Sequence, residues 1–245
     1  MMQKVFTRPK ALKDYPTHYC PGCGHGIAHR LVSEVIDELG IQGKTIGIAP
    51  VGCAVLAYDY FDVDMVEVAH GRAPAVATGM KRTNPDKIVF SYQGDGDLAA
   101  IGTAEIIHAA HRAEQLTVIF INNAVFGMTG GQMAPTTMLG QITATTINGR
   151  QADGQGYPLN VSELLAVLPG AIYVERCALA SPALIRKSKA ALKHAFELQI
   201  NNAKGLSLVE LLSPCPTYWR MTPPDAMLYI QNEMTKVFPL GRLKG

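Results

Sequence analysis

Short apolar runs of strand length alternate along this chain with longer segments in which apolar residues recur every three or four positions. Runs of the first kind predict buried β-strands, and segments of the second kind predict amphipathic helices. Their alternation favours an α/β fold in which helices cover a mostly parallel sheet. We expect strands at Lys44–Ala49, Asp86–Tyr92, Leu116–Asn122, Ala171–Cys177 and Leu206–Leu212, and helices at Gly26–Leu39, Arg72–Arg82, Asp97–Ala113, Val161–Leu168 and Pro182–Ile200.

The 245 residues are enough for one large domain, and neither an internal repeat nor a low-complexity linker divides them. We therefore expect a single doubly wound domain over residues 1–245, ending in a tail from 216 to 245 that carries a short helix at Asp225–Val237. The segment Gly127–Tyr157 is rich in Gly, Thr, Gln and Met and has little periodicity. A loop of that length inside a compact domain is usually functional or mobile.

Composition excludes some classes of function. A formal net charge of +2 with 17% charged residues gives no basis for binding nucleic acid or an anionic membrane surface. The first residues lack the apolar segment of a secretion signal, and no stretch approaches the roughly 18 apolar residues of a membrane helix. We expect a cytoplasmic protein, in which reducing conditions favour metal-binding or catalytic roles for the five cysteines over disulfides.

The sequence Gly94-Asp95-Gly96-Asp97 follows one predicted strand, and Asn123 follows the next, 28 residues after Asp95. Glycines let the backbone approach a phosphate, and the following helix presents its N-terminus to it. Parallel strands end at the same sheet edge, so Asp95 and Asn123 should lie together and offer the oxygen ligands that Mg²⁺ prefers. Asp-Gly turns and asparagines at strand ends are also common without any function.

Four cysteines are placed to meet at that same edge. Cys20 and Cys23 are three residues apart in a glycine-rich loop, a spacing that lets both thiols reach one metal centre. Cys53 and Cys215 each follow a predicted strand, so both should emerge beside Asp95. Four thiolates could hold a structural zinc ion, but zinc cannot accept an electron from a neighbouring group, whereas an iron–sulfur cluster can. Cys177 falls within a strand and is expected to be a buried free thiol.

The motif of Gly94–Asp97 with Asn122–Asn123 resembles that of the thiamine diphosphate enzymes. This resemblance implies that Asp95 and Asn123 bind Mg²⁺ through their side chains and Val125 through its carbonyl oxygen. It further implies contacts to the diphosphate from Gly96, Asp97, Gly127 and Met128.

The segments around Cys20, Cys53 and Cys215, in this order around the Gly94–Asp97 motif, resemble the β subunits of 2-oxoacid:ferredoxin oxidoreductases. The resemblance covers essentially the whole chain and implies that Cys20, Cys23, Cys53 and Cys215 hold a 4Fe–4S cluster close to the thiamine. It also implies that Thr129–Gln132, which follows the metal ligands, forms a loop over the cofactor. The cofactor pocket implied by the resemblance includes two further segments: Val51, Gly52, Cys53 and Ala54, and His70, Gly71, Arg72 and Ala73.

The implied reaction is the oxidative decarboxylation of a 2-oxoacid, with electrons passed singly to the cluster and on to ferredoxin, and the acyl group taken by coenzyme A. The 216–219 segment favours a 2-oxoglutarate or branched-chain substrate. Thiamine activation needs a carboxylate, and Glu34, Glu38 and Glu105 are all expected on outward helix faces. We therefore expect that glutamate on an α subunit with a pyrimidine-binding domain, in a complex that could include γ and δ chains.

Two other functions remain open at this point. A non-redox thiamine diphosphate decarboxylase or carboligase subunit would have incidental or zinc-binding cysteines. A pure electron-transfer module would bind a cluster without thiamine, and would leave Asp95, Asn123 and the Thr129–Gln132 loop without a role.

Overall fold

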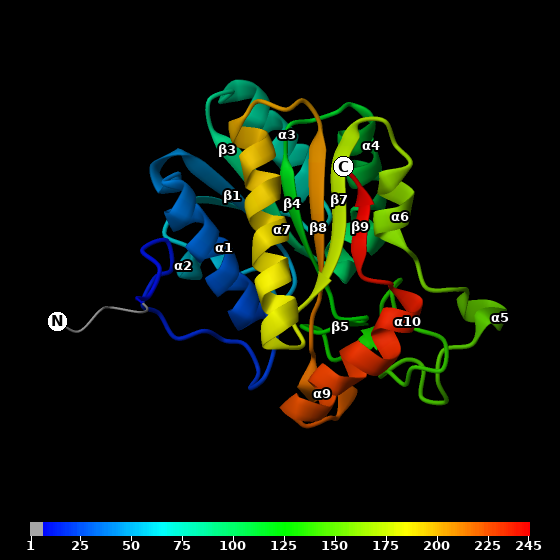
Figure 1. Cartoon of the computed structure of the whole chain (residues 1–245). Coiled ribbons are helices and arrows are strands. Elements are labelled where there is room, and N and C mark those ends of the chain that lie inside the picture. Colours follow the sequence, from blue (N-terminus) through cyan, green and yellow to red (C-terminus); the bar gives the residue numbers. More distant parts are fainter. Residues whose placement is uncertain (1–6) are drawn as a thin grey trace.

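The computed structural model describes residues 7–245. Its centre is a seven-stranded sheet in the order β2-β1-β3-β4-β8-β7-β9, flanked by helices on both faces (Figure 1). Neighbouring strands are parallel except for β9, which runs antiparallel to β7. The strands are β1 (Thr45–Pro50), β2 (Asp64–Val68), β3 (Ile88–Gly94), β4 (Thr117–Asn122), β7 (Ala171–Ala178), β8 (Leu206–Leu212) and β9 (Gly241–Lys244), with a separate small hairpin of β5 (Val125–Phe126) and β6 (Gln132–Met133).

The direction in which the chain crosses the sheet decides which face each helix covers. From β2 to β4 the chain moves one way along the sheet, and from β7 to β8 it moves back. Because such crossovers are right-handed, the two directions place their helices on opposite faces. The helical segments are α1 (His25–Leu39), α2 (Ala57–Tyr60), α3 (Ala73–Thr83), a π-helical turn (Asp97–Ile101), α4 (Thr103–His111), α5 (Ala152–Gln155), α6 (Val161–Ala166), α7 (Pro182–Ile200), α8 (Pro216–Trp219), α9 (Pro223–Tyr229), a second π-helical turn (Ile230–Met234) and α10 (Thr235–Val237).

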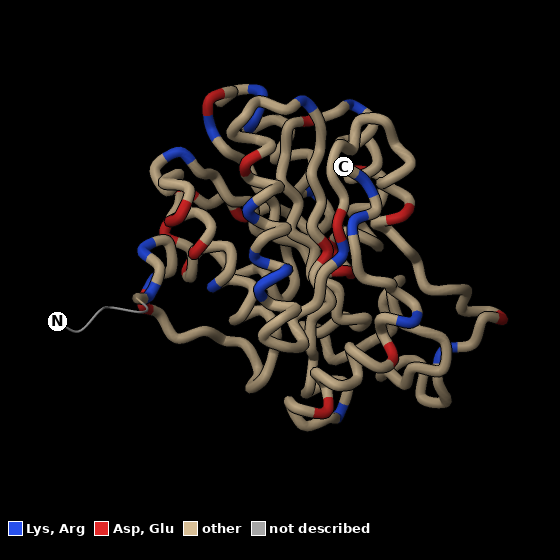
Figure 2. Tube along the Cα trace, viewed as in Figure 1, with Lys and Arg blue, Asp and Glu red and all other residues tan. Residues whose placement is uncertain are grey.

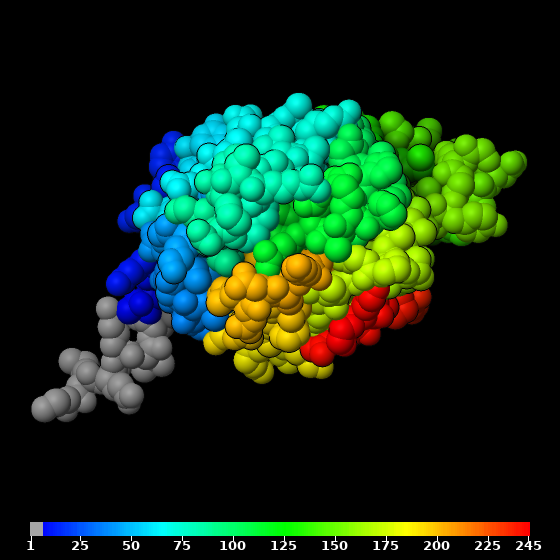
Figure 3. Space-filling view, turned by 90° about the horizontal axis from the view of Figure 1, so that it is seen from above, coloured from blue at the N-terminus to red at the C-terminus, as the bar shows by residue number. Residues whose placement is uncertain are grey.

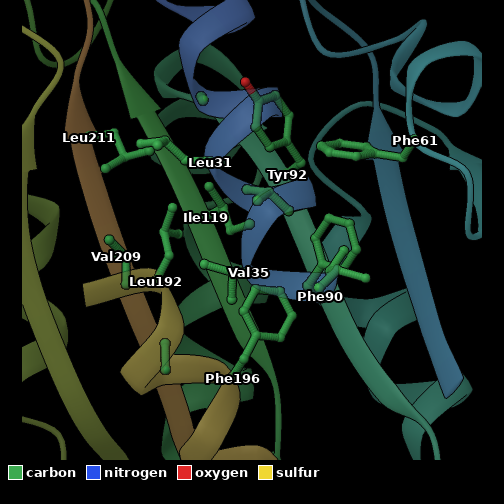
Figure 4. Packing of buried hydrophobic residues seen from close by; sticks show 14 of the residues in the cluster. Leu31, Val35, Phe61, Phe90, Tyr92, Ile119, Leu192, Phe196, Val209 and Leu211 are labelled. Carbon is green, nitrogen blue, oxygen red and sulfur yellow. The ribbon is translucent and has the colours of Figure 1, made fainter. Parts of the chain in front are cut away.

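One face of the sheet is covered by α1 and α7, and Figure 4 shows the core between them and the strands. Residues spaced by four on each helix point inward, so that each helix presents one apolar stripe. The side chains that meet here include Leu31 and Val35 of α1, Leu192 and Phe196 of α7, and Phe90, Tyr92, Ile119 and Val209 of the sheet. The opposite face packs against α3, α4 and α6 through residues that alternate with these along the same strands, among them Val89, Val118, Phe120 and Leu208.

All five expected strands and all five expected helices are present, and the short C-terminal helix is found as α9, a π-helical turn and α10. Strand β2 ends two residues before His70. Two details differ. The helix expected at Asp97–Ala113 starts with the π-helical turn, where Gly102 packs directly on the backbone of Gly71, and it ends at His111. The edge strand β9 was not expected, since its four residues, mostly exposed, show no apolar alternation.

The long segment Gly127–Tyr157 is held together by one buried cation. The Arg150 guanidinium donates to the backbone carbonyls of Pro135, Thr137, Gln155, Gly156 and Tyr157. The far part of this segment, around α5, projects from the side of the molecule in two perpendicular views (Figures 1 and 3). The loop is therefore built as a folded unit with its own internal hydrogen bonds.

Charges of both signs are spread over the surface rather than gathered into a block of one sign (Figure 2). Among residues 7–245, no helix is long and apolar enough to cross a membrane.

Candidate functional site

The loops that follow β1, β3, β4 and β8 meet at the carboxyl edge of the parallel sheet, the lower end in Figure 1. This is the edge where open α/β sheets bind ligands. Asp95 follows β3, Asn123 follows β4, and Cys53 and Cys215 follow β1 and β8. The sequence prediction that these four residues share one edge is confirmed.

Oxygen atoms of Asp95, Asn123 and Val125 face one another. One terminal atom of the Asn123 carboxamide lies 3.2 Å from Asp95 Oδ2 and 2.8 Å from the Val125 carbonyl oxygen. In the orientation of the structure that atom is the amide oxygen, whereas rotating the amide would let its nitrogen donate to both oxygens. Adjacent ligands of an octahedral Mg²⁺ with bonds of about 2.1 Å are themselves about 3 Å apart. The three groups therefore fit a magnesium site.

Asp95 is almost completely buried, at 3% exposure. Its carboxylate accepts hydrogen bonds from the Gly96 backbone N–H at 2.8 Å and from the Thr136 hydroxyl at 2.9 Å. Burial nevertheless raises the pKa of Asp95 to about 7, and those hydrogen bonds only partly oppose the effect. A nearby cation would remove the penalty of burying this charge.

Asp97 connects the Gly94–Asp97 turn to the start of α3. Its Oδ1 accepts from the Gly71 N–H and from His70 Nδ1, both at 2.6 Å, and its Oδ2 accepts from Gln93 Nε2 at 2.6 Å. Gly71 has a φ of +76° and lies so close to Gly102 that a Cβ would collide with its backbone. The carboxylate thus holds the loop that carries His70 against the wall of the site.

A cavity of about 190 Å³ opens between these loops. Its lining contains twelve of the residues that the sequence places at the cofactor or the metal: Val51, Gly52, Cys53, Ala54, His70, Asp95, Gly96, Asp97, Asn123, Val125, Gly127 and Met128. Gly71, Arg72 and Ala73 do not line it. The Arg72 guanidinium instead pairs with Glu105 of α4 at 2.5 Å.

The four cysteines line a second cavity of about 180 Å³, which shares Cys53, Asn123, Gly127 and Met128 with the first. Within residues 7–245, no three His, Cys, Asp or Glu side chains are grouped closely enough to hold a single metal ion. The cysteines instead surround a space. Cys177, on β7, is buried and does not line this cavity, as the sequence predicts.

Two glycines allow the first cysteine loop to reach the last. Gly24 donates its N–H to the Pro214 carbonyl at 3.1 Å, and a Cβ at this position would lie 2.2 Å from Ser213 Oγ. Gly22, with a φ of +78°, would carry a Cβ 2.6 Å from Pro223. The C-terminal segment is tied to the oxygen site as well, because Trp219 Nε1 donates to the Asn123 carbonyl at 3.0 Å.

Burial raises the pKa of the Cys53 thiol to about 12, and it also raises those of Cys23 and Cys215. The neighbouring thiols add to the effect at each position. Thiolates are the ligand form of cysteine, so these side chains would ionise together only around a positively charged group.

A cluster of histidine and tyrosine rings backs both cavities, and sequence reasoning missed it. His25 Nδ1 lies 2.8 Å from the Tyr92 hydroxyl, and His29 Nε2 lies 2.7 Å from the Tyr19 hydroxyl. The Tyr19 and His25 rings are stacked with centroids 4.6 Å apart. Burial lowers the pKa of His25 to about 3, so its imidazole is neutral. The available signal was the four-residue spacing between His25, directly before the predicted helix Gly26–Leu39, and His29 within it.

A family model, curated relatives and a solved structure all compare this chain with thiamine pyrophosphate-dependent enzymes of one family. A family model described as "Thiamine pyrophosphate enzyme, C-terminal TPP binding domain" matches residues 50–211. A protein named ketoisovalerate oxidoreductase subunit VorA, from Methanothermobacter thermautotrophicus, is 51% identical over all of this chain and 53% of its own length. The chain thus spans about half the length of that relative.

Other relatives are matched over more of their length. The 2-oxoglutarate synthase subunit KorB of Archaeoglobus fulgidus is 35% identical over 90% of this chain and 78% of its own. A solved structure, the 2-oxoglutarate:ferredoxin oxidoreductase from Magnetococcus marinus with 2-oxoglutarate, coenzyme A and succinyl-CoA bound, aligns with a TM-score of 0.78 and 30% identity over 97% of this chain and 84% of that one. The chain belongs to the thiamine pyrophosphate-binding subunits of the 2-oxoacid:ferredoxin oxidoreductases.

Proposed function

We propose that this chain holds thiamine diphosphate, Mg²⁺ and one 4Fe–4S cluster in an enzyme that oxidises a branched-chain 2-oxoacid to its acyl-CoA and CO₂ and passes the electrons to ferredoxin. The observation that carries the proposal is the common wall of the two cavities, formed by Cys53, Asn123, Gly127 and Met128. A cofactor in the first cavity and a cluster in the second would lie on either side of these residues.

The residues present fit both inorganic groups. Asp95, Asn123 and the Val125 carbonyl would hold Mg²⁺, while the backbone of Gly96 and Gly127 would approach the diphosphate. Cys20, Cys23, Cys53 and Cys215 would hold the cluster. A zinc site closes tetrahedrally on a single ion with bonds of about 2.3 Å, whereas these thiols surround a space that accommodates a larger group.

The bound cofactor would supply the carbanion chemistry, and the protein would orient it and provide the electron acceptor. The carboxylate that activates the thiamine pyrimidine ring would come from a partner subunit. Among the described residues no glutamate lines either cavity: Glu105 pairs with Arg72, and Glu34 and Glu38 pair with Lys189 on the surface.

The branched-chain substrate is proposed from two observations. The ketoisovalerate subunits of two Methanothermobacter species are 51% and 52% identical to this chain, against 35% to 38% for four 2-oxoglutarate subunits. The described cavity lining also includes the apolar side chains of Val51, Ile101, Ile121 and Phe126, and it has no Lys or Arg to pair with a second substrate carboxylate.

The test is an assay of the anaerobic complex of this chain with its partner subunits against 2-oxoisovalerate, 2-oxoglutarate and pyruvate, with ferredoxin as acceptor. The proposal expects coenzyme A-dependent ferredoxin reduction, fastest with 2-oxoisovalerate, from a brown protein whose colour bleaches on reduction. A colourless, iron-free preparation that decarboxylates 2-oxoacids would support a non-redox decarboxylase subunit instead. A preference for 2-oxoglutarate would overturn the proposed branched-chain substrate but not the proposed redox function.

A further inference from the structure

Two imidazoles line the cofactor cavity, those of His25 and His70. Each has its Nδ1 engaged by another residue, so that Nε2 is the ring nitrogen available to a ligand. What Nε2 can do depends on which nitrogen carries the proton, and this is fixed by the hydrogen bond that the other nitrogen makes.

The partner of His25 Nδ1 is a donor. The Tyr92 hydroxyl is fully buried on β3, and in the part of the chain that the structure describes its hydrogen-bond partner is His25 Nδ1, at 2.8 Å. A buried hydroxyl proton without an acceptor is costly, so Tyr92 donates and Nδ1 accepts. The proton of the imidazole is therefore on Nε2, where it can be donated into the cavity.

His70 is oriented differently. Its Nδ1 lies 2.6 Å from Asp97 Oδ1, and a carboxylate oxygen can only accept, so Nδ1 of His70 is a donor. The proton that the hydrogen-bond partner fixes is therefore on Nδ1 in His70 and on Nε2 in His25. The two side chains are therefore not interchangeable.

The other polar side chains of the described lining are already engaged. The Thr129 hydroxyl donates to Gln132 Oε1 at 2.7 Å, and the Asn123 carboxamide faces the metal site. The carboxylates of the lining, Asp95 and Asp97, accept hydrogen bonds and offer none to an anion. An anionic substrate entering beside them needs a donor for its oxygens, and the Nε2–H that Tyr92 fixes on His25 is a side-chain donor of this lining.

We propose that His25 donates its Nε2–H to an oxygen of the anionic 2-oxoacid bound in the cofactor cavity, and that Tyr92 sets the ring in the tautomer that makes this possible. This inference rests on the proposed function and deepens it by assigning a substrate contact to the chain. His25 is a substrate-binding residue in this account, and Tyr92 is a positioning residue that acts through it.

The test uses the assembled anaerobic complex, saturated with Mg²⁺ and thiamine diphosphate, and measures binding of 2-hydroxy-3-methylbutanoate by calorimetry. This probe has the carboxylate and the C2 oxygen of the branched substrate but no carbonyl carbon for the cofactor to attack. His25→Leu should weaken its Kd about 10- to 100-fold, as expected for the loss of a hydrogen bond to a charged group. His25→Gln, which keeps an N–H near the position of Nε2, should stay within about threefold of the original chain.

Tyr92→Phe tests the tautomer of His25 while leaving the imidazole ring in place. Without the phenol, Nδ1 can take the proton and Nε2 becomes an acceptor, so the Kd should weaken about 3- to 10-fold. Tyr60→Phe is the matched control, because it also removes a buried tyrosine hydroxyl that bonds a histidine. Tyr60 lines neither cavity, and its partner His18 lines only the cysteine cavity. It should leave the Kd unchanged within about twofold.

The outcomes separate this inference from the function on which it rests. Equal Kd values for His25→Leu and the original chain, equal weakening by Leu and Gln, or failure of the original complex to bind the probe would overturn the role of His25. Loss of thiamine diphosphate binding in His25→Leu would overturn it too, by making His25 part of the cofactor site. Failure of the original complex to bind thiamine diphosphate would instead refute the proposed function.

Discussion

Asp95 is a buried carboxylate that lies beside the oxygen atoms of Asn123 and Val125. We predict that Asp95→Asn abolishes Mg²⁺-dependent binding of thiamine diphosphate to the assembled complex. The loss should exceed the roughly 10- to 100-fold typical of residues behind a metal ligand, since a ligand itself is removed. Calorimetry measures it, with Asp153→Asn, an exposed acid on α5, as the control. Retention of cofactor affinity by Asp95→Asn would remove this residue from the metal site.

The pKa of Asp95 also gives a pH dependence. Burial raises it from the usual 3.8 to about 7 in the metal-free chain. The stability that the protonated side chain contributes is therefore fully present below pH 3.8 and is lost as the pH rises through about 7. Mg²⁺ requires the carboxylate and must displace that proton. We predict that Mg²⁺ affinity falls as the pH drops below about 7, and that Asp95→Asn binds Mg²⁺ weakly without this dependence. A flat profile between pH 5 and 8 would contradict the prediction.

Gly24 provides a test at the cysteine cavity. A Cβ there would lie 2.2 Å from Ser213 Oγ and 2.8 Å from Pro214 Cδ, so Gly24→Ala should push the Cys20–Cys23 loop away from Cys215. We predict loss of most of the iron per chain, measured chemically on protein isolated without oxygen. Gly26→Ala is the matched control, since nothing lies within 4 Å of a Cβ at that position. Full iron content in Gly24→Ala would show that the two segments need not touch.

At the scale of elements, a buried ion network joins three strands behind the site. Arg176 of β7 is fully buried; its Nε donates to Glu210 of β8 at 2.7 Å, and its two terminal nitrogens pair with Glu163. Glu210 accepts in turn from Asn122 of β4 at 2.7 Å, directly before the metal-site residue Asn123. The network therefore fixes the end of β4 relative to β7 and β8.

We predict that Arg176→Met lowers the free energy of unfolding by about 3 to 5 kcal/mol, because Glu210 is left buried without its partner. Arg242→Met removes another Arg–Glu pair, 3.5 Å long and half exposed, and should cost less than about 1 kcal/mol. Urea unfolding of the two variants measures the difference. Equal stabilities would mean that the buried network contributes no more than a surface pair.

Helices and strands were predicted well where the apolar periodicity of their own residues determines them. They were predicted poorly where contacts with distant segments determine them. Strand β8 and helix α7 were predicted with the bounds they have, since their burial patterns follow the sequence directly. Strand β9 forms because β7 offers it an open edge, which no local pattern of Gly241–Lys244 reveals. The π-helical turn at Asp97–Ile101 likewise depends on the packing of Gly102 against Gly71.

At the scale of the whole molecule, sheet topology explains how much of the site could be inferred from sequence. Parallel strands deliver Cys53, Asp95, Asn123 and Cys215 to one edge, so their place at that edge followed from the predicted strand direction. That β1, β3, β4 and β8 are consecutive strands is a finding of the structure. The direction of individual side chains did not. Arg72 pairs with Glu105 outside the cavity, and the oxygens of Asp97 are bonded to His70, Gly71 and Gln93, contacts between segments that no local sequence pattern reveals.

The central claim is that electrons pass from a cofactor in one cavity to a cluster in the other, across a wall that includes Cys53. The most direct measurement is electron paramagnetic resonance of the assembled anaerobic complex, frozen after 2-oxoisovalerate is added without any external electron acceptor. The account predicts the signal of a reduced 4Fe–4S cluster that appears only when thiamine diphosphate and Mg²⁺ are present. An iron-loaded complex with bound thiamine diphosphate that consumes 2-oxoisovalerate and shows no reduced cluster would contradict it.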